Sequence, residues 1–264
     1  IVFDGHYSYF IYDNTTLVKY SSESSRIVTY PLEDLIGQNE IEISYSLVGN
    51  SSAKKLFVIN DNIIFELLIQ AEDKISFSRK YEVSEASRVY STTIDKQNRI
   101  WASRASESNL YYSSDSVDTD NSDLIQFPIH IDRPRIYITR LLTLRNGNIA
   151  AAFNDIGLGI INPDTKDIQY IKLSEKYNRM YIRTMCEDRS GNIWAGSATF
   201  GLFIYNPSTG TVTTPAQFAG KNISAIALSD TGEMLISSQY TLGRKDCLMG
   251  LTYATGNFLS IRRF

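Results

Sequence analysis

Short apolar stretches alternate with polar turns along the chain, and the alternation is clearest over residues 181–215. Four stretches rich in Ile, Val, Thr, Tyr and Phe lie there, at residues 182–186, 192–195, 201–205 and 211–214. Runs of this length and composition, bounded by turn residues, are typical of β-strands. The turns between them hold Asp, Ser, Asn, Pro and Gly, which favour tight bends. We therefore predict four strands joined by short turns.

The same pattern occurs twice, at a constant offset of 44 residues. Residues 146–151 read Asn-Gly-Asn-Ile-Ala-Ala, and residues 190–195 read Ser-Gly-Asn-Ile-Trp-Ala. A Gly-Leu pair follows each copy, beginning at Gly157 and at Gly201. Because the offset is kept across the whole unit, the pattern is an internal repeat. A repeat of this length with four strands indicates one blade of a β-propeller.

Weaker copies extend the pattern toward both ends of the chain. Residues 95–102 and 230–236 resemble the turn and second strand of the unit. Near the start, residues 61–68 are expected to end one unit and residues 26–30 to end the first. Six units result, and 264 residues divided among six agree with the offset of 44. We predict an all-β fold, a propeller of about six four-stranded blades over residues 1–264, complete or part of a seven-bladed propeller.

Composition excludes several classes of partner. The chain is 43% apolar, which suffices for a large core, and its net charge of −3 comes without a basic stripe, so nucleic acid is not expected to bind. No apolar run is long enough to cross a bilayer. The chain begins at Ile1 without a signal sequence, and we expect it to be a piece of a longer protein. Cys186 and Cys247 are expected to be buried thiols.

Residues 187–196 read Glu-Asp-Arg-Ser-Gly-Asn-Ile-Trp-Ala-Gly, and with the Gly201-Leu202 pair they resemble the two-component regulator propeller repeat. The copy near Asn146 keeps the pattern but has Ala150 in place of Trp. The resemblance implies the periplasmic sensor region of a hybrid histidine kinase that responds to oligosaccharides. It also implies a homodimer formed through the parent sensor, with membrane contact only through segments further along that protein.

The best-defined residues of the repeat are Asp188, Gly191 and Trp194, which could contact a ligand or shape the blade. We favour the second interpretation, in which Asp188 caps the turn and the indole packs between blades. Trp101 occupies the equivalent position of another unit, which supports a packing role.

No catalytic, metal or cofactor site is predicted. The two histidines, His6 and His130, lie far apart in sequence, as do the two cysteines, whereas metal sites draw on several such ligands. Residues 188–194 also resemble the sialidase Asp-box, but the glycine spacing differs and no carboxylate pair marks a glycosidase. We expect no enzyme in this segment, with a propeller glycoside hydrolase kept as an alternative.

The loops at one end of the blades are the candidates for ligand binding. They join the second strand to the third, and the fourth strand to the next unit. Aromatic rings stack on sugar C–H faces, and Arg, Asn and Asp bond hydroxyls, although the same residues suit a protein partner. The predicted ligand-binding residues are Tyr137, Arg135, Asn154, Tyr177, Arg179, Tyr181, Phe200 and Tyr240, with Arg104, Arg133, Asp155, Thr199 and Gln239 in the same loops. We predict an oligosaccharide-sensing propeller; a protein-interaction or dimerisation scaffold without a small ligand is the first alternative.

Overall fold

The structure is a computed structural model that describes residues 2–3, 6–37, 45–50, 54–71, 73–83, 88–105, 107–114, 124–129, 131, 135–176, 179–229, 231–240, 246–254 and 257–263. In these ranges the strands form six four-stranded sheets, and within each sheet the strands are neighbours in chain order. Helical structure in the same ranges is limited to α1 (Leu32–Ile36) and the short 3-10 helix η2 (Ala216–Phe218). The predicted all-β fold of six four-stranded units is confirmed.

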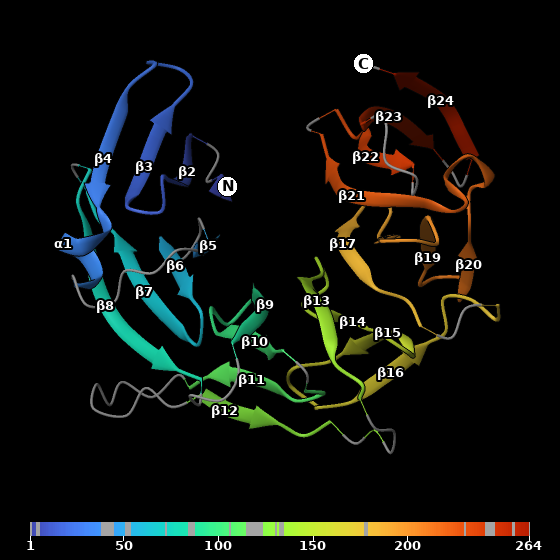
Figure 1. Cartoon of the computed structure of the whole chain (residues 1–264), viewed down its shortest axis with the longest axis horizontal. Coiled ribbons are helices and arrows are strands. Elements are labelled where there is room, and N and C mark those ends of the chain that lie inside the picture. Colours follow the sequence, from blue (N-terminus) through green and yellow to red (C-terminus); the bar gives the residue numbers. More distant parts are fainter. Residues whose placement is uncertain are drawn as a thin grey trace. The chain divides into compact units, whose positions relative to one another are not determined.

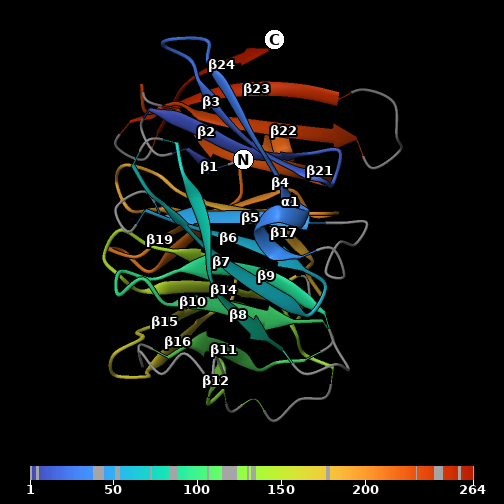
Figure 2. The same ribbon diagram turned by 90° about the vertical axis from the view of Figure 1, so that its left-hand side faces the viewer.

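The chain divides into two compact units, Ile1–Ile129 and His130–Phe264. Figures 1 and 2 show the first unit, in which the second sheet lies between the first and the third. Its three sheets consist of β1 (Val2–Phe3), β2 (Tyr7–Tyr12), β3 (Thr16–Ser21) and β4 (Ile27–Pro31); β5 (Tyr45–Asn50), β6 (Lys55–Asn60), β7 (Ile63–Ile69) and β8 (Ile75–Glu82); and β9 (Val89–Ile94), β10 (Ile100–Arg104), β11 (Leu110–Ser113) and β12 (Leu124–Phe127).

The expected end of the second sheet at Leu68 is wrong. Residues 63–69 form β7, an inner strand of that sheet, and β8 pairs along it antiparallel, from Ile63 opposite Glu82 to Ile69 opposite Ile75. Charged residues in β8, including Arg79 and Lys80, conceal the strand in the sequence because an outer strand exposes much of its surface to water.

The second unit also holds three sheets, and in Figure 1 the middle one lies between its two neighbours. They consist of β13 (Ile138–Thr143), β14 (Ile149–Phe153), β15 (Gly157–Ile161) and β16 (Ile168–Ile171); β17 (Ile182–Glu187), β18 (Ile193–Ser197), β19 (Leu202–Asn206) and β20 (Thr211–Thr213); and β21 (Lys221–Leu228), β22 (Met234–Tyr240), β23 (Asp246–Ala254) and β24 (Asn257–Arg263). The four strands predicted from residues 181–215 are confirmed.

Within each unit the sheets pack face to face. The second strands β10, β14 and β18 are buried along their whole length. The last strands are more exposed, as β4 and β20 illustrate. One apolar cluster joins the sheets β13–β16 and β17–β20, with Leu158 and Ile193 among its members, and another joins β17–β20 to β21–β24. Within each unit, therefore, stacking of successive sheets buries an apolar core.

The turn before β18 has the structural role that we favoured. Asp188 is buried, and its Oδ1 accepts hydrogen bonds from the backbone N–H groups of Ser190 and Asn192, both at 2.9 Å. Gly191 within the turn has φ of 83°. Trp194 is fully buried in the cluster that joins the last two sheets. The capping and packing interpretation is confirmed.

The repeated Gly-Leu pair also has a structural cause. Gly201 has φ of 93°, and a Cβ atom at this position would lie 2.1 Å from the carbonyl oxygen of Phe218. Gly157 has φ of 116°, and its Cβ would lie 2.3 Å from the carbonyl oxygen of Ile171. The backbone approaches too closely for any side chain, so only glycine fits at the entry to these third strands.

The part of the chain that the structure describes holds no helix whose length and hydrophobicity would suit a bilayer crossing. Cys186 is a free thiol, half-buried beside the last core cluster, and burial raises its pKa. The side chain of Cys247 lies outside the described residues.

Candidate functional site

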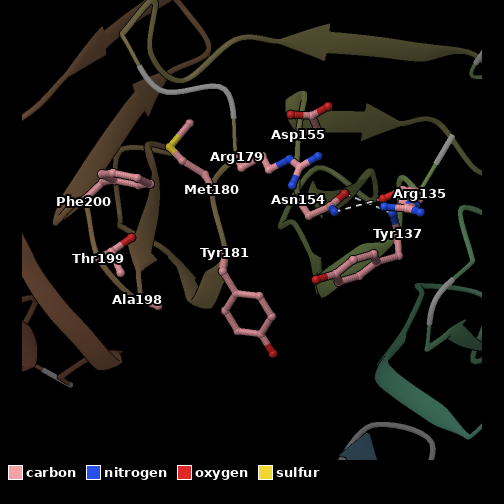
Figure 3. Close-up of a pocket in the computed structure, with 10 residues that line it drawn as sticks. All are labelled: Arg135, Tyr137, Asn154, Asp155, Arg179, Met180, Tyr181, Ala198, Thr199 and Phe200. Carbon is pink, nitrogen blue, oxygen red and sulfur yellow. Dashed lines mark hydrogen bonds between the residues drawn. The ribbon is translucent and has the colours of Figure 1, made fainter. Parts of the chain in front are cut away.

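A cavity of about 360 Å³ lies in the second unit, at one end of the sheets β13–β16 and β17–β20. Four chain segments form it. Two of them run into the first strands β13 and β17, and two follow the second strands β14 and β18. The lining residues, drawn in Figure 3, are Arg135, Tyr137, Asn154, Asp155, Arg179, Met180, Tyr181, Ala198, Thr199 and Phe200. The loops proposed for ligand binding in these two sheets therefore come together.

The repeat builds both halves of the pocket in the same way. The backbone N–H of Asn154 donates to the carbonyl oxygen of Tyr137 at 3.1 Å, and 44 residues later Ala198 donates to Tyr181 at 2.9 Å. A third bond joins the halves, because the N–H of Met180 donates to the carbonyl oxygen of Asn154 at 2.7 Å. Each tyrosine is thus held at the same place, one residue before the first strand of its sheet.

The side chain of Asn154 fixes the rim of the pocket. Its Oδ1 accepts from the backbone N–H of Tyr137 at 3.0 Å, and its Nδ2 donates to the carbonyl oxygen of Arg135 at 3.1 Å. These bonds hold Arg135 in a left-handed conformation with φ of 63°. Figure 3 shows both bonds and the guanidinium of Arg179 reaching toward Asn154. Because its amide already bonds the backbone, Asn154 is placed to position the arginine and tyrosine of its loop.

A β-bulge begins each first strand directly beyond the pocket. The pairing of β13 with β14 shifts between Ile138 and Arg140, and that of β17 with β18 shifts between Ile182 and Thr184. Such bulges bend a strand and redirect its side chains. Here they follow immediately after Tyr137 and Tyr181, so the chain changes direction where it leaves the pocket.

The apolar side of the pocket is continuous with the core. Met180 is buried in the cluster that joins the two sheets, and Phe200 packs against that cluster. The backbone N–H groups of Thr199 and Phe200 lie 3.3 and 3.2 Å from the hydroxyl oxygen of Ser197, which accepts from both. This side is consequently fixed by the fold, whereas Arg135 and Arg179 are exposed to solvent.

Six of the eight predicted ligand-binding residues line the pocket: Arg135, Tyr137, Asn154, Arg179, Tyr181 and Phe200. Tyr177 lies outside the described residues, as does Arg133. Tyr240 ends β22 in the last sheet, and neither its side chain nor that of Gln239 is described.

The prediction that Arg104 lies in a loop is wrong: it is the last residue of β10, in the first unit, where it is buried. Its guanidinium is 3.3 Å from Glu107 and donates to the hydroxyl of Tyr111 at 3.1 Å. These partners give Arg104 a structural role within its own sheet.

Met180 and Ala198 also line the pocket but were not singled out from the sequence. A signal for the site was present: residues 135–138 read Arg-Ile-Tyr-Ile and residues 179–182 read Arg-Met-Tyr-Ile, again 44 residues apart. Repetition of Arg and Tyr immediately before each first strand places equivalent side chains at the same end of neighbouring sheets.

The comparisons with known proteins agree with this architecture. The family described as "Two component regulator propeller" matches residues 176–199, a segment that includes β18 and one half of the pocket. No curated protein matches the sequence.

Three solved structures illustrate the fold. Virginiamycin B lyase from Staphylococcus aureus has 12% sequence identity and a TM-score of 0.66, over 99% of this chain and 85% of the lyase. The propeller domain of Cps50 (Swd1) from Myceliophteria thermophila has 14% identity and a TM-score of 0.68, over 98% of this chain and 82% of that chain. At these identities the likeness shows the propeller fold, which hosts many unrelated functions.

The third structure is an extracellular domain assigned to a hybrid two component system from B. thetaiotaomicron. It has 17% identity and a TM-score of 0.61, over 86% of this chain but only 30% of that longer chain. The chain is therefore a β-propeller in which residues 176–199 match the two-component regulator propeller repeat.

Proposed function

We propose that this chain is the extracytoplasmic ligand-sensing propeller of a hybrid two-component sensor, and that it binds an oligosaccharide in the pocket between the sheets β13–β16 and β17–β20. The family match, described as a two component regulator propeller, supports the first part, and the matched residues 176–199 also include Arg179 and Tyr181 of the pocket. The fold shared with extracellular domains of hybrid two component systems supports the location.

The observation that carries the proposal is the composition of the pocket. Two tyrosines, two arginines and an aspartate line a cavity of about 360 Å³, which lies within the usual range of about 300–1,000 Å³ for ligand pockets. Tyrosine rings offer apolar surfaces on which sugar C–H groups stack, and the phenol hydroxyl can bond a sugar hydroxyl. Guanidinium and carboxylate groups supply directional donors and acceptors.

Signal transfer follows from differential affinity. In this proposal the parent sensor is a homodimer, and the ligand prefers one arrangement of the paired propellers over another. A ligand with equal affinity for both arrangements would shift nothing, however tightly it bound. The pocket joins two sheets, so a bound molecule contacts both and can favour one relative placement of their loops.

The test is titration calorimetry of the purified propeller with a broad panel of neutral and charged oligosaccharides. We expect saturable binding of one glycan class. Tyr181→Ala should then weaken that binding roughly thirtyfold, equivalent to about 2 kcal/mol, because a central aromatic contact is lost. Tyr137→Ala should act in the same direction.

Tyr12→Ala is the matched control, since Tyr12 is 66% exposed and lies on β2 in the other unit. The affinity of Tyr12→Ala for the oligosaccharide should equal that of the unmodified protein. The melting temperature of every variant should lie within a few degrees of that of the unmodified protein. The proposal fails if no oligosaccharide in a broad panel produces saturable heat, or if Tyr12→Ala weakens binding as much as Tyr181→Ala does.

A further inference from the structure

The pocket lining carries more positive than negative side chains, whereas the chain as a whole has a negative net charge. The formal net charge of the protein is −3, yet Arg135 and Arg179 line the pocket together with a single acidic residue, Asp155. Each arginine stands two residues before the tyrosine of its repeat, so the pair is built into the duplicated unit. Within the described ranges, no carboxylate forms an ion pair with either guanidinium.

Two further arginines, Arg140 and Arg183, lie in the first strands β13 and β17, outside the pocket lining. Arg140 in β13 donates from Nε to the carbonyl oxygen of Arg183 in β17, and from Nη1 to that of Thr139 at 3.1 Å. Burial lowers the pKa of Arg140, and the nearby charge of Arg183 lowers it further. Both of these hydrogen bonds go to backbone oxygens, so neither of them pairs the charge of Arg140 with a carboxylate.

The two segments that contain these arginines hold no acidic residue. Residues 135–140 and 179–183 contain four arginines, of which Arg135 and Arg179 line the pocket, and Asp155 is the single acidic residue of that lining. Like charges gathered at the end of two sheets repel one another, and a concave site lined by one sign of charge concentrates ions of the opposite sign. An anionic ligand would reduce this repulsion, whereas a neutral sugar would leave it unchanged.

We infer that the ligand is an anionic oligosaccharide, one that carries carboxylate or sulfate groups, and that Arg135 and Arg179 bind its charged group. This inference rests on the proposed function. Guanidinium groups present paired N–H donors that match the oxygens of a carboxylate or a sulfate. The adjacent Tyr137 and Tyr181 supply the surfaces for the sugar ring, so charge and ring recognition repeat together in each half of the pocket.

The experiment compares matched neutral and charged glycans by calorimetry at 50 mM and 500 mM NaCl. The probes are a neutral galactan oligosaccharide, an oligogalacturonide and a sulfated chondroitin disaccharide. We expect at least tenfold tighter binding of a charged probe than of the neutral one. That preference should shrink at high salt, where screening weakens exposed charge pairs. The oligogalacturonide and the chondroitin arms distinguish a carboxylate-selective site from one that needs sulfate.

Variants separate charge from folding. Arg135→Gln and Arg179→Gln should each weaken binding of the charged probe tenfold or more, and Arg179→Lys should restore part of it by keeping the charge. Arg189→Gln is the control, because Arg189 is exposed in the turn at the opposite end of β18 and its replacement changes the net charge equally. Its affinity should be unchanged.

The outcomes distinguish the two ideas. A neutral glycan that binds with equal affinity at both salt concentrations, and is lost in Tyr181→Ala but not in the arginine variants, overturns the anionic ligand and leaves the sensing function standing. Absence of saturable binding with every probe, charged or neutral, overturns both. Equal losses in Arg189→Gln and Arg179→Gln would show that net charge, rather than the pocket, governs the affinity.

Discussion

The indole Nε1 of Trp194 donates a 2.8 Å hydrogen bond to Oδ2 of Asp188, and both side chains are buried. In the first unit, Trp101 donates to Asp95 in the same way at 2.7 Å. This geometry, which the two repeats share, explains why Asp and Trp occur six residues apart in them. The carboxylate caps the turn with one oxygen and accepts from the indole with the other. In the copy of the repeat near Asn146, Leu144 and Ala150 stand at the equivalent positions, so both partners are replaced together.

We predict that Asp188→Leu lowers the free energy of unfolding by about 2–4 kcal/mol, because the buried N–H groups that it accepts from lose their partner. Trp194→Ala should lower it by about 3–5 kcal/mol through loss of a fully buried side chain. The double variant, which restores the pairing seen at Leu144 and Ala150, should cost less than the sum by about 1–3 kcal/mol. Urea denaturation measures all three.

Asp167→Ala provides the control for loss of an acidic side chain, since Asp167 is exposed in the turn before β16. Its unfolding midpoint should match that of the unmodified protein. Strict additivity of the two single changes would contradict the proposed coupling between Asp188 and Trp194.

The close approach at Gly201 gives a second prediction. Gly201→Ala places a Cβ atom 2.1 Å from a backbone oxygen, so the chain must shift, and we expect a loss of about 3 kcal/mol or more. Gly210→Ala is the matched comparison, because Gly210 also has positive φ, 70°, but open space around it. The left-handed conformation alone should cost about 1–2 kcal/mol there. Equal losses in chemical denaturation would show that φ, and not the contact with Phe218, selects glycine at Gly201.

Tyr81 in the first unit predicts a pH dependence of stability. Its hydroxyl donates to Glu66 at 3.0 Å, and burial, followed by the negative charge of Glu66, raises its pKa far above the usual value near 10. Above pH 10 the unfolded chain loses this proton while the folded chain keeps it, so stability falls as pH rises. Between pH 10 and 12 the unmodified protein should lose up to about 1 kcal/mol more per pH unit than Tyr81→Phe does. Parallel pH profiles for the two proteins would contradict this account.

Asn154→Ala tests whether the side chain of Asn154 fixes the rim of the pocket through its bonds to Tyr137 and Arg135. The equivalent residue in the next repeat is Ala198, which keeps the corresponding backbone bond, so we expect a stability loss of only about 1 kcal/mol. Release of Tyr137 N–H and the Arg135 carbonyl should nevertheless weaken ligand binding five- to tenfold, through greater freedom of Arg135. Calorimetry and thermal unfolding of the same samples separate the effects. Asn206→Ala, in the exposed turn before β20, should leave binding unchanged.

The strands and turns of this protein follow from local sequence. The Asp-x-x-Gly turn, the apolar second strand and the Gly-Leu pair each have a short-range physical cause, so the copy at residues 181–215 predicts four strands correctly. Residues 63–69 show the limit: they resemble a final strand because β8, with its charged residues, lacks an apolar pattern. The antiparallel pairing of β8 with β7 in the structure shows that a further strand follows residues 63–69.

Sequence alone determined the period of 44 residues, and with it the equivalence of Arg135 with Arg179 and of Tyr137 with Tyr181. Only the tertiary structure decided that these four residues line one cavity while Arg104, the last residue of β10, is buried against Glu107. The physical reason is the range of the interactions. Turns and strands depend on neighbours a few residues away, whereas a pocket depends on how residues distant in the chain meet when one sheet packs against the next.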